Sequence, residues 1–140
     1  MNMQTFETNS IKELENIAKL ILLSIQDKKV LLFYGDLAVG KTALIKQLIK
    51  SLGINEEAVS PTFTVMNEYG DAIKAYHYDI YQNGSDGFIA SNLWQNLLHE
   101  GYHFIEWADA RVENLLESIG IKFVRIVMEK QNETRIIKIT

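Results

Sequence analysis

A short loop at residues 35–42 carries the residue types that bind phosphate. It reads Gly-Asp-Leu-Ala-Val-Gly-Lys-Thr and has the spacing GxxxxGK[ST]. In such a loop backbone N–H groups surround an anion, a lysine reaches the β- and γ-phosphates, and a hydroxyl holds Mg²⁺. We therefore predict nucleotide binding, and the alternative is a glycine turn with a solvated lysine. The predicted nucleotide-binding residues here are Gly35, Leu37, Ala38, Val39, Gly40, Lys41, Thr42 and Ala43.

A carboxylate at the end of an apolar run is the second candidate. Residues 102–107, Tyr-His-Phe-Ile-Glu-Trp, read as a strand that ends at Glu106. A metal ion held by a phosphate loop needs a second protein anchor, and Glu106 would supply it beside Thr42. The alternative is a glutamate that leaves the core where its strand ends.

The segment His77-Tyr78-Asp79-Ile80-Tyr81 places polar side chains at alternating positions. Because side chains of a strand alternate between its faces, His77, Asp79 and Tyr81 share one face. Asp79 is a catalytic candidate, together with Lys41 and Glu106, that would orient water or bind Mg²⁺ through water. The alternative is a solvated edge of the sheet, and for His77 we expect a structural role.

The single proline of the chain stands in Ser-Pro-Thr-Phe-Thr at residues 60–64. Pro61 restricts one backbone dihedral and removes a donor just before an expected strand. Thr62 and Thr64 are switch-like candidates, because hydroxyls in such a loop can sense a γ-phosphate. The alternative is an ordinary turn.

The elements that must position these residues follow from the apolar pattern. The run at 30–34 predicts a buried strand before the loop, and the spacing at 43–52 predicts a helix that Gly53 stops. Ser10 opens a capping box before the first amphipathic helix. Further strands are expected at 3–8, 62–69, 73–81 and 102–107, further helices at 89–98 and 110–119, a breaker at 84–87, and a closing hairpin of 121–128 with 134–140.

This order of elements predicts one α/β domain spanning residues 1–140. We expect a three-layer, P-loop NTPase-like domain with a mixed, largely parallel central sheet and a C-terminal β-hairpin. A chain of 140 residues, 47% hydrophobic and 23% charged, is long enough to bury a core.

Charge and composition exclude several classes of function. The net charge of -4 and the lack of a basic patch argue against tight binding to nucleic acid by the chain alone. The sequence has no cysteine, which excludes disulfides and thiolate metal sites. It also has no apolar stretch long enough to span a bilayer, so we expect a cytoplasmic protein with no membrane partner.

Five motifs in a fixed order resemble the TsaE family, formerly YjeE, the bacterial ATPases of tRNA threonylcarbamoyladenosine biosynthesis. They are Gly-Asp-Leu-x-x-Gly-Lys-Thr at 35–42, Ser-Pro-Thr-Phe-Thr at 60–64, Asn-Glu-Tyr at 67–69, His-x-Asp-x-Tyr at 77–81 and Ile-Glu-Trp at 105–107. The resemblance covers nearly the whole chain, and the ordered set is more specific than the loop alone.

The resemblance implies an ATP-hydrolysing subunit that acts with TsaD and TsaB on tRNA, with tRNA reached only through that complex. It implies Mg²⁺ as cofactor and ATP as substrate, with Thr42 and Glu106 on the metal, Lys41 on phosphate and Asp79 supporting hydrolysis. Adenine contacts are implied near Ser10 and near the turn of the terminal hairpin.

The chain departs from the usual family pattern inside the loop and after Tyr81. It has Ala38-Val39 where the family commonly has Gly-Ala, Ala43 where it has a second threonine, and Gln82 where it has an arginine. All three arginines, Arg111, Arg125 and Arg135, follow the strand of Glu106. No upstream residue can therefore act as an arginine finger, and we expect slow hydrolysis that partner proteins accelerate.

Two other functions fit the same loop. A small-molecule kinase would use the same cradle, although this short chain shows neither an arginine-bearing lid nor a second substrate pocket. A nucleotide-gated binding module would use ATP to stabilise a partner-binding surface, with little turnover. A GTPase is disfavoured because neither Asn-Lys-x-Asp nor Asp-x-x-Gly occurs.

Overall fold

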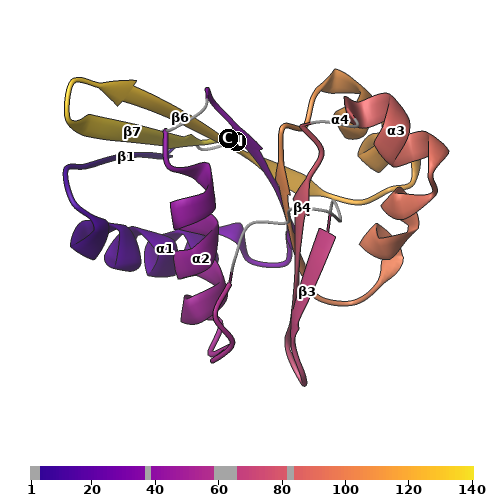
Figure 1. Cartoon of the computed structure of the whole chain (residues 1–140), viewed down its shortest axis with the longest axis horizontal. Coiled ribbons are helices and arrows are strands. Elements are labelled where there is room, and N and C mark those ends of the chain that lie inside the picture. The colour runs from indigo at the N-terminus through magenta and orange to yellow at the C-terminus, as the bar shows by residue number, and fades with distance from the viewer. Residues whose placement is uncertain (1–3, 37–38, 59–65, 82–83) are drawn as a thin grey trace.

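A computed structural model describes residues 4–36, 39–58, 66–81 and 84–140. Helices cover both faces of a central sheet, which makes three layers (Figure 1). The strands are β1 (Gln4–Thr8), β2 (Val30–Tyr34), β3 (Met66–Gly70), β4 (Lys74–Asp79), β5 (Tyr102–Glu106), β6 (Phe123–Gln131) and β7 (Thr134–Ile139). The helices are α1 (Ile11–Ile25), α2 (Lys41–Ser51), α3 (Gly84–Ala90) and α4 (Ala110–Ser118), with a 3₁₀ helix η1 (Leu93–Leu98).

The sheet has the strand order β1-β7-β6-β2-β5-β4-β3. Its four inner strands β6, β2, β5 and β4 are parallel, and the outer strands β7, β1 and β3 are added antiparallel. The predicted mixed sheet and closing hairpin are thus confirmed. The parallel strands β2, β5 and β4 all end at one edge of the sheet, which is where ligands bind in open α/β sheets.

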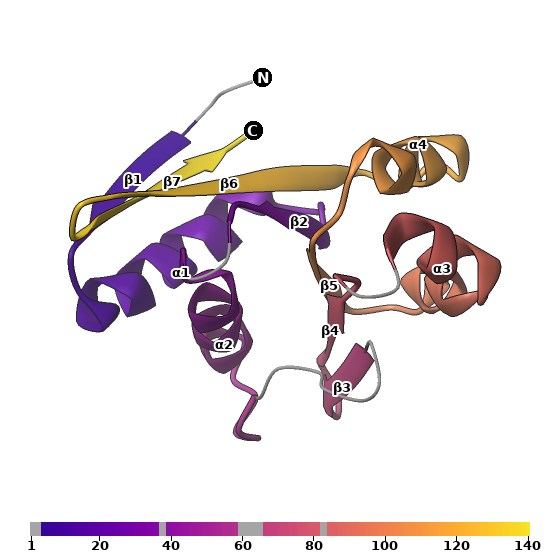
Figure 2. The same cartoon turned by 45° about the horizontal axis from the view of Figure 1, so that its top comes forward.

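The two faces of the sheet bury two separate hydrophobic clusters. Helices α1 and α2 cover one face, where Leu31 and Phe33 of β2 are fully buried, and α3, η1 and α4 cover the other, with Leu32 (Figure 2). A strand buried on both faces reads as a continuous apolar run, which explains the sequence Val-Leu-Leu-Phe-Tyr of β2.

Helix α1 begins as its capping box predicts. The Ser10 hydroxyl accepts the N–H of Glu13 at 3.2 Å, and the buried side chains recur with helical spacing at Leu14, Ala18 and Ile21. Helix α2 instead begins after Gly40, whose φ of 99° lies in the left-handed region. Glycine adopts this conformation at little cost, so the chain can turn from the loop directly into α2.

The segment at 84–87 is not the breaker that we predict from its two glycines. It forms the first half of α3, and Phe88 in the same helix is 1% exposed, with its ring edge-on to Tyr78 at 5.8 Å. Burial of an aromatic ring outweighs the roughly 1 kcal/mol by which a glycine disfavours a helix. The expected single helix at 89–98 is also interrupted, because Asn92 has a φ of 62° and the chain continues as η1.

Two strand boundaries differ from the predicted ones. Strand β6 continues to Gln131, so the hairpin turn contains only Asn132 and Glu133, and Asn132 has the positive φ that asparagine tolerates. Strand β3 includes Gly70. The predicted start of that strand, residues 62–65, lies outside the described residues.

Candidate functional site

The carboxyl ends of three neighbouring parallel strands bring the predicted catalytic residues together. Phe33 of β2 is in register with Glu106 of β5, which is in register with Asp79 of β4. Lys41 and Thr42 open α2, which follows the loop after β2. The site therefore combines a helix N-terminus, a lysine and two carboxylates at one edge of the sheet.

Thr42 and Glu106, the two residues predicted to hold a metal, are in direct contact. The Thr42 hydroxyl lies 3.2 Å and 3.1 Å from the two carboxylate oxygens of Glu106 and donates to them. Glu106 is 3% exposed. The alternative, a glutamate that leaves the core at the end of its strand, is therefore wrong.

His77 is the second partner of Glu106. Its Nε2 lies 2.6 Å from Oε2 of Glu106, and both side chains are buried. Nε2 donates in this contact, whereas Nδ1 is buried and has no partner among the described residues. The structural role expected for His77 is therefore to orient the carboxylate that faces Thr42. The feature of the sequence that pointed to His77 was its position two residues before Asp79, on the same face of the strand.

Asp79 is half-buried at the end of β4. Its Oδ1 accepts the N–H of Tyr81 at 3.1 Å. Burial raises the pKa of Asp79 above its ordinary value, the Tyr81 N–H opposes this shift, and the charge of Glu106 adds to it. A carboxylate with a raised pKa is suited to orienting a water molecule or to accepting a proton from it.

Lys41 is enclosed, although a phosphate-binding lysine would be expected to be accessible. The side chain is 4% exposed, Nζ donates to the Gly35 carbonyl, and Nζ lies 3.3 Å from the centre of the Trp107 ring. Burial lowers the pKa of Lys41, while the charges of Glu106 and Asp79 oppose that shift. The solvated lysine of the alternative interpretation is therefore not observed.

The loop itself is described at Gly35, Asp36, Val39 and Gly40, while Leu37 and Ala38 lie outside the described residues. Gly35 has a φ of 145°, and a Cβ there would come within 2.6 Å of the Met128 carbonyl oxygen. Two of the family departures have a packing reason. The Val39 side chain is buried in the cluster under α1 and α2, and Ala43 packs against the same cluster.

Arg135 reaches the loop from the terminal hairpin, a contact that sequence reasoning missed. Its Nε donates to the Val39 carbonyl at 3.0 Å. Arg135 is also in register with Thr8 of β1, and Thr134 donates to Asn9 at 2.7 Å. The start of α1, the hairpin and the loop therefore adjoin, and the Ser10 hydroxyl caps α1. The expected adenine contacts at these segments stay a prediction.

The other two arginines form ion pairs with carboxylates. Arg111 pairs with Asp86, and Arg125 pairs with Glu113, which also accepts the Tyr34 hydroxyl. The switch candidates Thr62 and Thr64 lie outside the described residues, so their placement stays a prediction.

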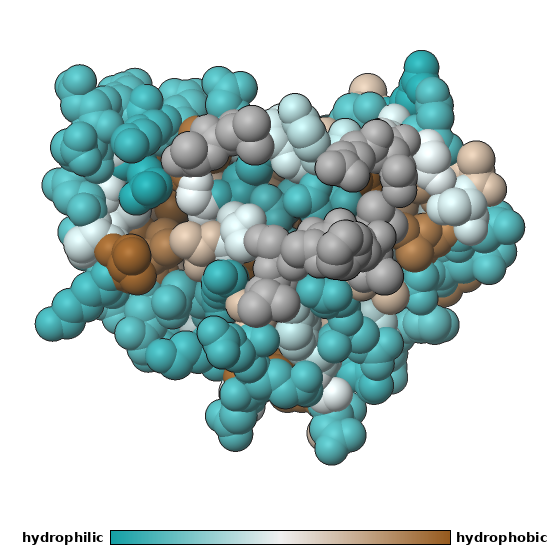
Figure 3. Space-filling view, in the orientation of Figure 1, coloured by the Kyte–Doolittle hydropathy of each residue, from teal (hydrophilic) through white to brown (hydrophobic). Residues whose placement is uncertain are grey.

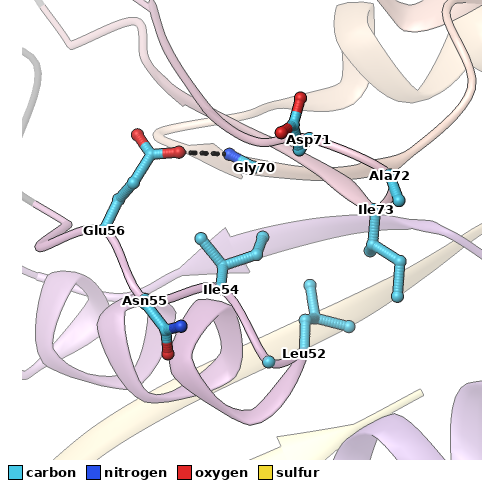
Figure 4. A pocket seen from close by; sticks show the side chains of 9 residues that line it. Leu52, Ile54, Asn55, Glu56, Gly70, Asp71, Ala72 and Ile73 are labelled. Atoms are coloured by element: carbon cyan, nitrogen blue, oxygen red, sulfur yellow. Dashed lines mark hydrogen bonds between the residues drawn. The ribbon is translucent and has the colours of Figure 1, made fainter.

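A surface pocket of about 600 Å³ adjoins the loop. It lies between the loop and the end of β6, and its lining residues are Gly35, Asp36, Val39, Val127, Met128, Glu129, Lys130 and Gln131. Another pocket, of about 570 Å³, lies where the end of α2 meets the turn between β3 and β4 (Figure 4). There Glu56 accepts the Gly70 N–H at 2.8 Å, and no predicted site residue lines the pocket.

Comparison with known proteins gives consistent matches. The family model of the threonylcarbamoyl adenosine biosynthesis protein TsaE matches residues 8–137. Curated proteins named tRNA threonylcarbamoyladenosine biosynthesis protein TsaE include one from Bacillus subtilis, 34% identical over 116 residues, covering 82% of this chain and 73% of the relative. One from Treponema pallidum is 31% identical over 110 residues, covering 78% of this chain and 82% of the relative.

Two further matches agree. The TsaE protein of a Nostoc species is 41% identical over 85 residues, which are 57% of this chain and 52% of that relative. The crystal structure of Bacillus subtilis YdiB superimposes with a TM-score of 0.69 and 26% identity, covering 99% of this chain and 84% of that one.

The sheet order and the loop between β2 and α2 define a three-layer α/β protein with a P-loop-like domain. Within that class the chain belongs to the TsaE family, which is involved in tRNA threonylcarbamoyladenosine biosynthesis.

Proposed function

We propose that this protein is a Mg²⁺-dependent ATPase that serves tRNA threonylcarbamoyladenosine formation. The observation that carries the proposal is the contact between Thr42 at the start of α2 and the buried Glu106. A hydroxyl and a carboxylate that meet at the N-terminus of a helix are the protein ligands that a magnesium nucleotide needs.

The residues present fit Mg²⁺. Mg²⁺ prefers oxygen ligands and is commonly held by one or two protein groups together with substrate phosphates. The described residues contain no group of three or more His, Cys, Asp or Glu arranged to hold a metal alone. Thr42 and Glu106 would hold the ion, which would neutralise charge on the β- and γ-phosphates.

The remaining roles follow from position. Lys41 binds phosphate, and the N–H groups around Gly40 at the start of α2 bind the same anion. His77 orients Glu106, and Asp79 positions the attacking water. The pocket beside Gly35 and Val39 takes the rest of the nucleotide, and Leu37, Ala38, Ala43 and the segment around Ser10 contribute to that binding.

We also propose that TsaD and TsaB are the partners and that tRNA is reached through them in the cytoplasm. The net charge of -4 supports indirect contact with RNA. No helix in the described parts of the chain is long and apolar enough to cross a membrane. Two of the three arginines form ion pairs, and the third donates to the Val39 carbonyl. Because each is engaged in this way, none is placed as an arginine finger, which supports slow hydrolysis by the chain alone.

The test is phosphate release from ATP with and without TsaD, TsaB and tRNA. Lys41→Ala should abolish release, and Lys46→Ala, on the exposed face of α2, is the matched control that should not. Partners should accelerate the wild type. Transfer of phosphate to a small molecule instead of water would favour a kinase. Full tRNA modification by an Asp79→Ala protein without turnover would favour the nucleotide-gated module.

A further inference from the structure

Trp107 has an unusual backbone for a residue with a bulky side chain. It follows Glu106 at the end of β5, and its φ of 67° lies in the left-handed region. That region is unfavourable for residues with a Cβ, and such residues gather at functional sites. The result here is that the indole face lies over Lys41, with Nζ 3.3 Å from the ring centre.

The ring and one carbonyl hold the Lys41 ammonium. Nζ donates to the Gly35 carbonyl, and among the described residues no carboxylate forms an ion pair with Lys41. The face of an indole carries partial negative charge and attracts a cation. Because the side chain is 4% exposed, a phosphate group cannot reach Nζ in this arrangement unless the cover moves.

A further neighbour of the indole lies at the surface. The Tyr81 ring is centred 4.6 Å from that of Trp107, and Tyr81 is 56% exposed. Hydrophilic side chains dominate the surface in the view of Figure 3. The indole also packs, half-buried, against the hydrophobic cluster under α3, η1 and α4. It therefore lies at the border between the core and the surface, with a cation on one side and an exposed ring on the other.

We propose that Trp107 is a displaceable cover of Lys41, which the phosphate groups of the nucleotide replace. The indole and the phosphate compete for one ammonium, so the contact lowers nucleotide affinity and favours a ligand with several negative charges. This inference rests on the nucleotide binding proposed above, and it adds a positioning role for a residue outside the loop.

Fluorinated tryptophan tests the competition, because fluorine withdraws charge from the ring face with little change in its shape. In a Trp94→Phe background, Trp107 is the only tryptophan and can be replaced by analogues with one to four fluorine atoms. Affinity for MgADP, measured by calorimetry, should rise with each fluorine, by about two- to thirtyfold in total. Trp107→Leu should also bind more tightly than the wild type.

The matched control is Trp107→Phe, which retains Trp94. Fluorination of that protein should leave MgADP affinity unchanged. If affinity falls or stays constant as Trp107 is fluorinated, Trp107 does not compete with phosphate and the inference is wrong, while nucleotide binding stands. If the unmodified protein does not bind MgADP, the proposed function and the inference both fail.

Discussion

Glu106 is the residue on which the site depends, because it is buried and hydrogen-bonded to side chains of two other elements. A buried carboxylate is unfavourable unless it is hydrogen-bonded, and Thr42 and His77 together provide those bonds. Each partner lies on a different element, α2 or β4. The carboxylate is thereby held facing the start of α2 before a ligand arrives, which lowers the reorganisation that binding would require.

The Thr42 hydroxyl can be tested with an isosteric change. Thr42→Val removes the donor to Glu106 and the proposed metal ligand while keeping the shape of the side chain. We expect MgADP affinity to fall by about ten- to hundredfold and no longer to depend on Mg²⁺. Titration calorimetry with and without Mg²⁺ measures this, with Thr42→Ser as the control that retains binding. A Mg²⁺ dependence that survives in Thr42→Val would exclude Thr42 as a ligand.

His77 acts through Glu106, so its loss should change the metal requirement. For His77→Ala we expect the Mg²⁺ concentration at half-maximal ATP hydrolysis to rise by about ten- to hundredfold, as for other partners of metal ligands. His77→Gln, which can still donate, should be less affected. His99→Gln, at an exposed position, is the control. An unchanged Mg²⁺ requirement in His77→Ala would show that the ring serves only packing.

At the scale of elements, α3 shows how packing outweighs local preference. Two glycines within four residues indicate a break, yet Phe88 is buried against Tyr78 and the segment is helical. Asp109 then links α3 to α4, because it caps α4 by accepting the N–H of Arg111 and also accepts the Ser85 hydroxyl at 2.8 Å. The helices that cover this face of the sheet are therefore positioned by tertiary contacts.

Phe88→Ala should test that account of α3. Removal of the ring leaves a cavity in the cluster, and we expect the free energy of unfolding to fall by about 3–5 kcal/mol. Urea denaturation followed by circular dichroism measures the loss. Phe88→Leu, which keeps most of the apolar volume, should lose clearly less. Equal stabilities of the two variants would mean that α3 does not depend on this ring.

At the scale of the whole molecule, a buried histidine couples the fold to pH. His103 of β5 is 2% exposed, its Nδ1 accepts the Tyr78 hydroxyl at 2.7 Å, and its Nε2 donates to the His99 carbonyl at 2.9 Å. Because a carbonyl oxygen only accepts, Nε2 carries a proton, and in the neutral ring Nδ1 is then free to accept the Tyr78 hydroxyl. Burial lowers the pKa of His103 to about 4.

His103 therefore predicts a loss of stability in acid. The unfolded chain binds a proton near pH 6.5 and the folded protein only near pH 4, so stability is full above pH 6.5 and falls between these values. The loss should reach about 3 kcal/mol by pH 4. Urea unfolding from pH 7 to 4 measures it. In His103→Gln the loss of unfolding free energy between pH 7 and pH 4 should be smaller by about that amount. An equal loss in the variant and the wild type would contradict the prediction.

Most elements of this protein could be predicted because their signals are local. The apolar run of β2, the capping box of Ser10 and the loop at 35–42 each occupy a few consecutive residues. The helical conformation of Gly87 in α3 could not be predicted in this way, because Phe88 beside it packs against Tyr78 of a distant strand.

The sequence by itself determined the phosphate loop, the strand and helix beside it, the candidate residues Thr42 and Glu106, and the family. It did so because residue types at short spacings specify backbone conformation and chemistry. Only the tertiary structure decided that His77 is hydrogen-bonded to Glu106, that Arg135 contacts Val39 and that the Trp107 ring lies over Lys41. The first two contacts join residues 29 and 96 positions apart, and the sheet order that brings such positions together depends on packing across the entire domain.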